Sequence, residues 1–156
     1  MRDNISMKLK AVIEIPKGNE RRWHLNFRKN AIEDFGPIKD RIPVNGGIMP
    51  VAYGYLEGTE NREENSEVVE EIDVLVFSKR NFAVGEKVDV EIFGCIKRAD
   101  GDHKILASDE TVSVEKLTDI SAEERDLVLK FFGHNHPIIS IEGKVEAEEY
   151  VKKSFV

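Results

Sequence analysis

Cysteine is nearly absent from this 156-residue chain, and its one cysteine, Cys95, can form neither an internal disulfide nor a cysteine zinc cluster. Long hydrophobic runs are also missing, since no apolar stretch approaches the ~20 residues of a membrane-spanning helix, so we expect no membrane partner. The start of the chain lacks the apolar block of a signal peptide, which predicts a cytoplasmic protein. Walker-type loops, Rossmann fingerprints and Gly-x-Ser-x-Gly elbows are absent as well.

Positive charge is in short supply, with 23 Lys and Arg against 30 Asp and Glu and a formal net charge of −7. A general nucleic-acid binder needs a basic face for phosphates, so we expect no nucleic-acid partner. A small basic pocket for a phosphorylated ligand stays compatible with this balance. The hydrophobic fraction of 40% suffices for a core, and the length predicts a single domain over residues 1–156.

The first two thirds of the chain have the patterns of strands and turns. Residues 8–15 partly alternate between polar and apolar and end at a Pro-Lys-Gly turn signal. Residues 23–27 alternate with period two, which predicts a second strand in a hairpin with the first. Residues 73–77 form a short, nearly continuous apolar run, which is typical of a buried strand.

A further pair of strands is predicted near the middle of the chain. Residues 88–97 alternate until Gly94, which indicates a bulge or a barrel corner. Residues 104–107 follow after Asp100-Gly101-Asp102, which suits a hairpin connection between the two strands.

The last third changes to helical spacing. Ser121 and Glu124 form a capping-box pattern, and Gly133 is a natural stop, so a helix is predicted over residues 121–133. A second amphipathic helix is predicted over residues 146–155. Several strands followed by two helices give an α+β fold, most simply a small barrel with the helices packed on it.

Carboxylates are the first candidate functional groups. Glu70 and Asp73 stand at the start of a predicted buried strand, and Asp100 and Asp102 flank the predicted hairpin turn. If these groups meet, their oxygens suit a hard divalent cation such as Mg²⁺. The alternative for residues 100–102 is an ordinary hairpin turn.

A second set of residues could hold phosphate oxygens. Arg22, Arg41 and Lys104 supply charge, and Tyr53 supplies a hydroxyl group. The alternative for Tyr53 is packing next to a turn. His134 and His136 could form a metal pair, but they follow a predicted helix end, where a loop role is the alternative.

Several of these segments, taken in order, resemble those of soluble inorganic pyrophosphatases of the first family. The similar segments are residues 11–18 (the Val-Ile-Glu-Ile-Pro-x-Gly strand), Asp40-Arg41 with residues 49–55 (the Tyr-Gly-Tyr region), residues 70–76 (the acidic signature), the set Asp100, Asp102 and Lys104, and residues 131–143 (Phe-Phe with Val-Glu-Gly). The resemblance covers nearly the whole chain.

This resemblance implies a five-stranded barrel of the oligonucleotide/oligosaccharide-binding (OB) type with two packed helices. It also implies hydrolysis of pyrophosphate to two phosphates, dependence on Mg²⁺ or Mn²⁺, and a homohexamer. The implied roles are catalysis for Glu70, Asp73 and Lys104, substrate binding for Arg22, Arg41, Tyr53 and Lys104, and metal binding for Asp73, Asp100 and Asp102.

Other positions depart from the family pattern. The departures are Val68 and Glu70 at the first two signature acids, His24 after Arg22, Met49 before the conserved proline, and Asn135 and His136 at a late Tyr-Lys pair. A lost ligand and a lengthened acid predict weakened activity. The alternatives are a non-catalytic relative that serves as a phosphate- or nucleotide-binding or oligomeric scaffold protein, and hydrolysis of another phosphoanhydride.

Overall fold

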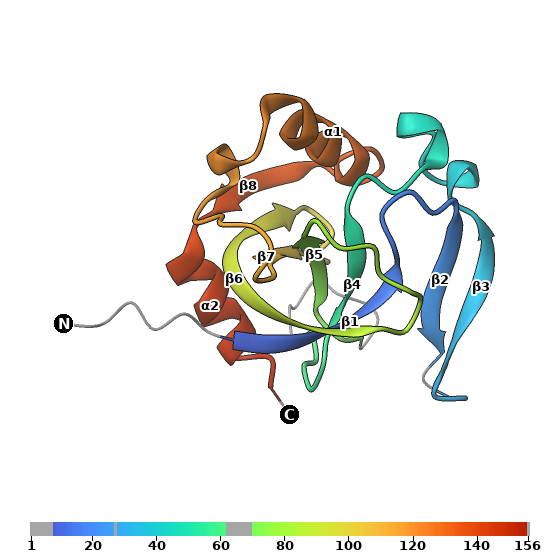
Figure 1. Ribbon diagram of the computed structural model, residues 1–156, viewed down its shortest axis with the longest axis horizontal. Helices are drawn as coiled ribbons and strands as arrows, with labels where there is room; N and C mark the ends of the chain where they lie inside the picture. The colour runs from blue at the N-terminus through green and yellow to red at the C-terminus, as the bar shows by residue number, and fades with distance from the viewer. Residues whose placement is uncertain (1–7, 27, 62–69, 156) are drawn as a thin grey trace.

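A closed five-stranded barrel forms the centre of the computed structural model, which describes residues 8–26, 28–61 and 70–155 (Figure 1). Around the barrel the order is β1-β4-β5-β7-β6, and pairing of β6 with β1 closes it. The predicted α+β fold with an OB-type barrel and two packed helices is confirmed. The barrel strands are β1 (Lys8–Ile15), β4 (Ala52–Leu56), β5 (Asp73–Phe77), β6 (Lys87–Arg98) and β7 (Lys104–Ser108).

The long strand β6 connects several parts of the fold. Its 12 residues pair with β1, with β7 and with an additional strand, β8 (Ile138–Glu142). The β6–β7 register shifts between Ile92 and Gly94, which confirms the predicted irregularity at Gly94. A side chain at Gly94 would meet Glu142 O at 2.9 Å, so a glycine lets β8 approach closely at this bend.

A two-stranded hairpin stands beside the barrel (Figure 1). It consists of β2 (Arg21–Asn26) and β3 (Ala31–Pro37), which pair antiparallel. The prediction that residues 23–27 pair with the first strand is therefore wrong. Both edges of β1 are taken by β4 and β6, so no edge of β1 is open to β2.

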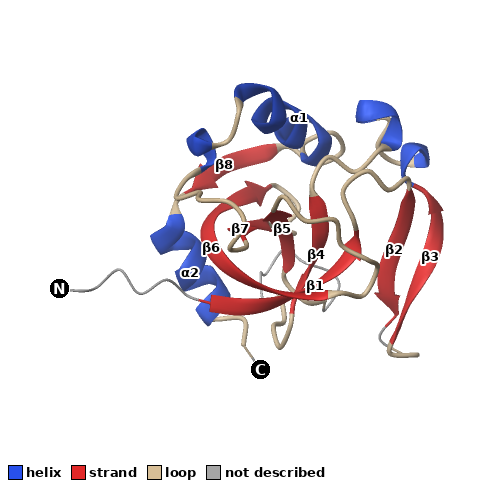
Figure 2. Ribbon diagram, in the orientation of Figure 1, coloured by secondary structure: helices blue, strands red, loops and turns tan. Residues whose placement is uncertain are grey.

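The first helix, α1 (Ala122–Phe132), confirms the predicted span and cap. The Ser121 hydroxyl accepts a hydrogen bond from the Glu124 amide at 3.2 Å, and Gly133 is the C-cap. Figure 2 shows α1 next to β8, outside the barrel strands.

The second helix is α2 (Lys144–Lys152). It begins two residues earlier than the predicted 146–155 span, and it ends three residues earlier than that span does. Gly143 caps its start. After Lys152 the chain leaves the helix, because Ser154 O accepts from the Glu60 amide at 2.7 Å and Phe155 bridges to Thr59. This tertiary pairing replaces the last helical turn that the periodicity predicted.

Three short 3₁₀ segments complete the described elements: η1 (Ile38–Asp40), η2 (Val44–Gly47) and η3 (Leu117–Asp119). Within the described ranges, no helix has both the length and the apolar character needed to cross a membrane.

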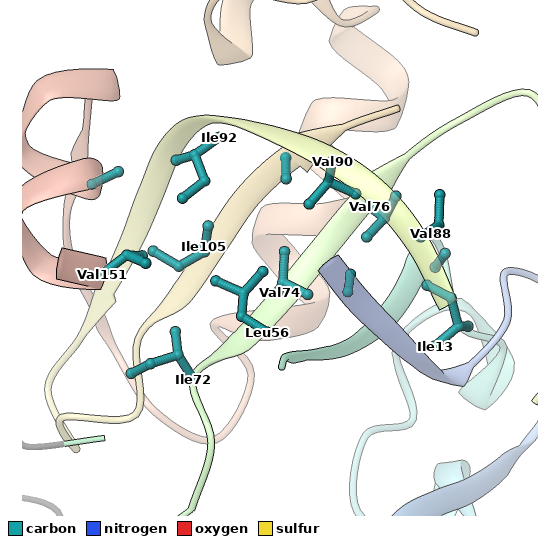
Figure 3. Packing of buried hydrophobic residues seen from close by; sticks show 14 of the residues in the cluster. Ile13, Leu56, Ile72, Val74, Val76, Val88, Val90, Ile92, Ile105 and Val151 are labelled. Atoms are coloured by element: carbon teal, nitrogen blue, oxygen red, sulfur yellow. The ribbon is translucent and has the colours of Figure 1, made fainter. Parts of the chain in front are cut away.

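Two hydrophobic clusters share the barrel wall. The first lies within the barrel and includes Ile13, Leu56, Val74 and Ile105, with Val151 of α2 packed against it (Figure 3). The second lies on the outer face of the same strands and includes Tyr53, Leu75 and Leu106, covered by Phe131 and Phe132 of α1. Side chains alternate along a strand, so Asp73 faces the same side as Leu75, away from the first cluster.

Candidate active site

A cavity of about 460 Å³ opens between the outer face of the barrel and the β2–β3 hairpin. Acidic side chains, basic side chains and several aromatic rings line this cavity. The lining residues are the carboxylates Glu14, Glu70, Glu71, Asp73 and Asp102, the cations Arg22 and Arg41, the rings His24, Phe35, Tyr53 and Tyr55, and Leu25.

Lys104 is the centre of a buried polar cluster beside this cavity. Its Nζ donates to Asp73 Oδ2 at 2.6 Å, to Asp102 Oδ2 at 3.1 Å and to Tyr53 OH at 3.2 Å. Only 3% of Lys104 is exposed. The parallel β5–β7 register places Asp73 opposite Lys104, and β4 lies on the other side of β5. The structure thus brings together four of the residues that the sequence singled out.

The two aspartates share this one ammonium group unequally. Burial raises the pKa of Asp73 well above its usual value, and the charge on Asp102 adds to the rise, although Lys104 opposes it. Burial also disfavours the charge on Asp102, but Lys104 and a hydrogen bond with Asp73 bring its pKa below the usual value. Asp73 and Asp102 together therefore retain a proton more readily than two isolated aspartates would. The position between their carboxyl groups thus favours additional positive charge.

The basic and phenolic groups keep their protons. Burial disfavours the charged form of Lys104, but Asp73 and Asp102 outweigh it and raise its pKa. Burial and nearby acids raise the pKa of Tyr53 well above its usual value and that of Tyr55 to about 12. The Tyr53 and Tyr55 hydroxyl groups, which line the cavity, therefore stay protonated. The three N–H groups of Lys104 are taken by Asp73, Asp102 and Tyr53.

Glu70 lies at the edge of the cavity, as the sequence predicted, and is exposed. Partial burial, followed by the charge on Asp102, raises its pKa. Glu71 also lines the cavity, and burial likewise raises its pKa. A carboxyl group with a raised pKa is suited to exchange protons near neutral pH. Val68, which the resemblance placed at the first signature acid, lies outside the described residues.

The two predicted arginines both line the cavity. Arg22 Nη2 donates to the carbonyl oxygen of Phe35, while its buried Nε has no partner among the described residues. Arg41 is exposed, and its carbonyl oxygen accepts from Asn135 Nδ2 at 3.0 Å. Both guanidinium groups therefore retain donors for a ligand.

Asp100 is not among the cavity-lining residues, although the sequence grouped it with Asp73 and Asp102. Arg98 takes its carboxylate instead, with Nη2–Oδ2 at 2.7 Å and Nε–Oδ1 at 3.3 Å. Although burial opposes it, Arg98 lowers the pKa of Asp100. The physical reason is that a buried guanidinium needs a carboxylate partner, and Arg98 is only 8% exposed.

The sequence did not identify several cavity residues. Tyr55 follows Tyr53 at a spacing of two, so the alternation of β4 could have placed it on the same face. Leu25 and Phe35 could not be placed, because the hairpin pairing was mispredicted. His134 and His136 lie in the turn after α1, which agrees with their loop alternative.

The cavity offers the type of donor that a divalent cation prefers, although the donors are not gathered into a ligand set in this arrangement. Its acidic side chains all offer carboxylate oxygens, the ligands that hard cations prefer. Across the part of the chain that the structure describes, no three His, Cys, Asp or Glu side chains are grouped so as to hold a metal ion. Lys104 neutralises Asp73 and Asp102 in this arrangement.

Comparison with solved structures identifies the fold as that of inorganic pyrophosphatases. The Ehrlichia chaffeensis pyrophosphatase aligns with a TM-score of 0.80 at 19% identity, covering 98% of this chain and 96% of that one. The Neisseria gonorrhoeae pyrophosphatase aligns with a TM-score of 0.79 at 21% identity, covering 94% and 88%. At these identities the likeness concerns the fold.

Sequence comparison gives the family. Residues 11–155 match the family described as inorganic pyrophosphatase. An inorganic pyrophosphatase of Ureaplasma parvum serovar 3 is 33% identical over 104 residues, which are 65% of this chain and 52% of that protein. The aligned part thus spans about half of that relative's length. The chain belongs to the inorganic pyrophosphatase family.

Proposed function

We propose that this chain hydrolyses inorganic pyrophosphate to two phosphates with the help of Mg²⁺ or Mn²⁺. The observation that carries the proposal is the buried cluster of Lys104, Tyr53, Asp73 and Asp102 beside a cavity that also holds two arginines. Family membership favours this function over a non-catalytic scaffold.

Phosphate oxygens are the ligands expected for the basic residues. Tyr53 offers its hydroxyl group from the barrel wall, where Lys104 holds it, and Arg22 and Arg41 offer guanidinium donors from other segments. Fixed donors of this kind stabilise the charge that develops on phosphate oxygens during transfer, without reorganisation of solvent.

The acidic residues take the complementary tasks. Asp73 and Asp102 are the proposed cation ligands, whereas Asp100 serves as the partner of Arg98. A bound divalent cation supplies charge neutralisation and makes a water molecule more acidic. Glu70, with its raised pKa at the cavity edge, is the proposed acceptor of the proton from the attacking water.

Reduced catalytic power is part of the proposal. Glu70 is one methylene longer than the aspartate of the family pattern, and a misplacement of about 1 Å can cost ~100-fold in rate. His24 and Met49 further change the family set of polar groups; His24 lines the cavity, whereas Met49 packs in the outer hydrophobic cluster.

A single domain, a homohexamer and a cytoplasmic location belong to the same proposal. Exposed apolar side chains support assembly: Ile139 and Ile141 on β8 and Val145 on α2 are 68%, 43% and 64% exposed. Among the described strands, the edge of β8 opposite β6 has no partner. Sedimentation at working concentration should therefore show a species larger than 17.7 kDa, and a monomer alone would contradict assembly.

Phosphate release tests the proposal. Purified protein with pyrophosphate should release phosphate in the presence of Mg²⁺ or Mn²⁺ and should stop when a chelator is added. Arg41→Ala should reduce turnover by one to a few orders of magnitude, because it removes a charge-assisted contact to the substrate. Arg28→Ala is the matched control, since Arg28 is exposed and does not line the cavity. Absence of release with either metal would refute the proposal.

A further inference from the structure

Phe35 gives the cavity an apolar surface that inorganic pyrophosphate cannot use. Phe35 is 47% exposed, and of the large hydrophobic residues exposed in the described ranges it is the one that lines this cavity. Leu25, from the other strand of the same hairpin, lines the cavity with it. This apolar wall of Phe35 and Leu25 offers no hydrogen bond or charge to a ligand whose surface consists only of phosphate oxygens.

A continuous series of contacts connects this wall to the polar cluster. The rings of Phe35 and His24 lie 6.1 Å apart between centroids, and those of His24 and Tyr53 also lie 6.1 Å apart. Tyr53 in turn contacts Lys104, which holds Asp73. The cavity therefore has the polar side chains of Tyr53 and Asp73 at one end, and the exposed Phe35 ring lies two ring contacts away from Tyr53.

The position of Phe35 is held by its backbone. Arg22 Nη2 donates to the Phe35 carbonyl oxygen, and Arg21 binds Asp34 with Nε–Oδ2 at 2.9 Å. The hairpin that carries the ring stands beside the barrel rather than in its wall (Figure 1). An anchored backbone with a half-exposed ring presents a ready surface for a planar group, because little ordering is needed on binding.

We propose that the cavity accepts a diphosphate that carries a nucleoside, with the diphosphate at Arg41 and Tyr53 and the base against Phe35 and His24. The inference rests on the proposed function and narrows its substrate class. Every base has a π-face that can stack on an aromatic side chain. The cavity volume of about 460 Å³ lies within the range of small-molecule sites, roughly 300–1,000 Å³.

The reaction on such a substrate is the same hydrolysis. Water adds to the terminal phosphorus, and the bridging P–O bond breaks with its electron pair leaving on the oxygen of the nucleoside monophosphate. The products are the monophosphate, orthophosphate and one proton.

Calorimetry with two non-hydrolysable probes tests the inference. The probes are methylenediphosphonate and adenosine 5′-(α,β-methylene)diphosphate, each titrated with Mg²⁺ present. Phe35→Ala should weaken binding of the adenosine probe by about tenfold and leave methylenediphosphonate unchanged, because base stacking contributes ~1–3 kcal/mol. Phe35→Trp should retain the adenosine affinity. Phe155→Ala should change neither, since Phe155 is a similarly exposed phenylalanine outside the cavity.

The outcomes separate this inference from the proposed function. Equal losses for both probes, or no loss for either, in Phe35→Ala would overturn the nucleoside site. Binding of methylenediphosphonate without the adenosine probe would also overturn it and leave pyrophosphate hydrolysis standing. Failure of both probes to bind would overturn the inference and the proposed function together.

Discussion

Replacing Lys104 with methionine should destabilise the protein strongly, because it leaves two carboxylates without their shared cation. The Lys104 and Asp73 side chains are 4% and 11% exposed, whereas that of Asp102 is 34% exposed. Removal of one partner from a buried ion pair costs ~3–5 kcal/mol. Solvent can compensate Asp102 in part, so we expect the lower end of this range, about 3 kcal/mol.

Urea denaturation measures this loss. With an m-value of ~2 kcal/mol/M, the midpoint should fall by about 1.5 M at neutral pH. Lys87→Met is the matched control: Lys87 pairs with Glu57 at 2.6 Å, but the side chains are 58% and 45% exposed. Such surface pairs contribute ~0–1 kcal/mol, so the control should barely shift the midpoint.

The pH dependence provides a second check. Without Lys104, the folded-state pKa values of Asp73 and Asp102 should rise, because their nearest cation is gone. Raised carboxyl pKa values mean that stability is lost as pH rises, so the deficit of Lys104→Met should shrink toward acid pH. Asp73→Asn combined with Lys104→Met should recover part of the loss. A Lys104→Met midpoint equal to that of Lys87→Met would refute the assignment of a buried cluster.

Three further predictions concern other parts of the molecule. The apparent pKa of the acid limb in the pH–rate profile should lie above 4.5, the usual pKa of glutamate, because burial raises the pKa of Glu70. In the Glu70→Gln variant, kcat should no longer show this acid limb. Arg98→Leu should lower stability in thermal melts by about 1.5–3 kcal/mol, as expected for hydrogen bonds to a charged group, and adding Asp100→Asn should restore part of it. Gly54→Ala should lower stability by more than about 2 kcal/mol in urea titrations, since the new Cβ would lie 1.9 Å from Val12 O across β1 and β4.

The strands that pattern alone predicted well are those with local signals. Residues 73–77 are almost purely apolar and form β5 at the predicted bounds, and residues 8–15 form β1. Barrel closure could not be predicted in this way, because no local sequence signal indicates that β1 pairs with both β4 and β6. That part of the prediction came from the family resemblance.

The differences between the pattern and the structure have equally specific causes. Strand β3, Ala31–Pro37, has no buried residue and lacks alternation, so no local strand signal marks it as the partner of β2. Asp100 and Asp102 stand two residues apart in a turn, and only the fold decides that one turns to Arg98 and the other to Lys104. Helix α2 ends early because tertiary pairing near Ser154 outweighs its periodicity.

The rate of pyrophosphate hydrolysis in wild type and Asp73→Asn, measured at saturating Mg²⁺, tests most directly whether the Lys104 cluster is the active site. Asp73 is a proposed cation ligand in contact with Lys104, so the substitution should lower kcat at least ~100-fold. Asp89→Asn is the matched control, because the Asp89 side chain is 79% exposed and lies outside the cavity, and it should retain the wild-type rate. Equal rates in wild type and Asp73→Asn would contradict this assignment of the site.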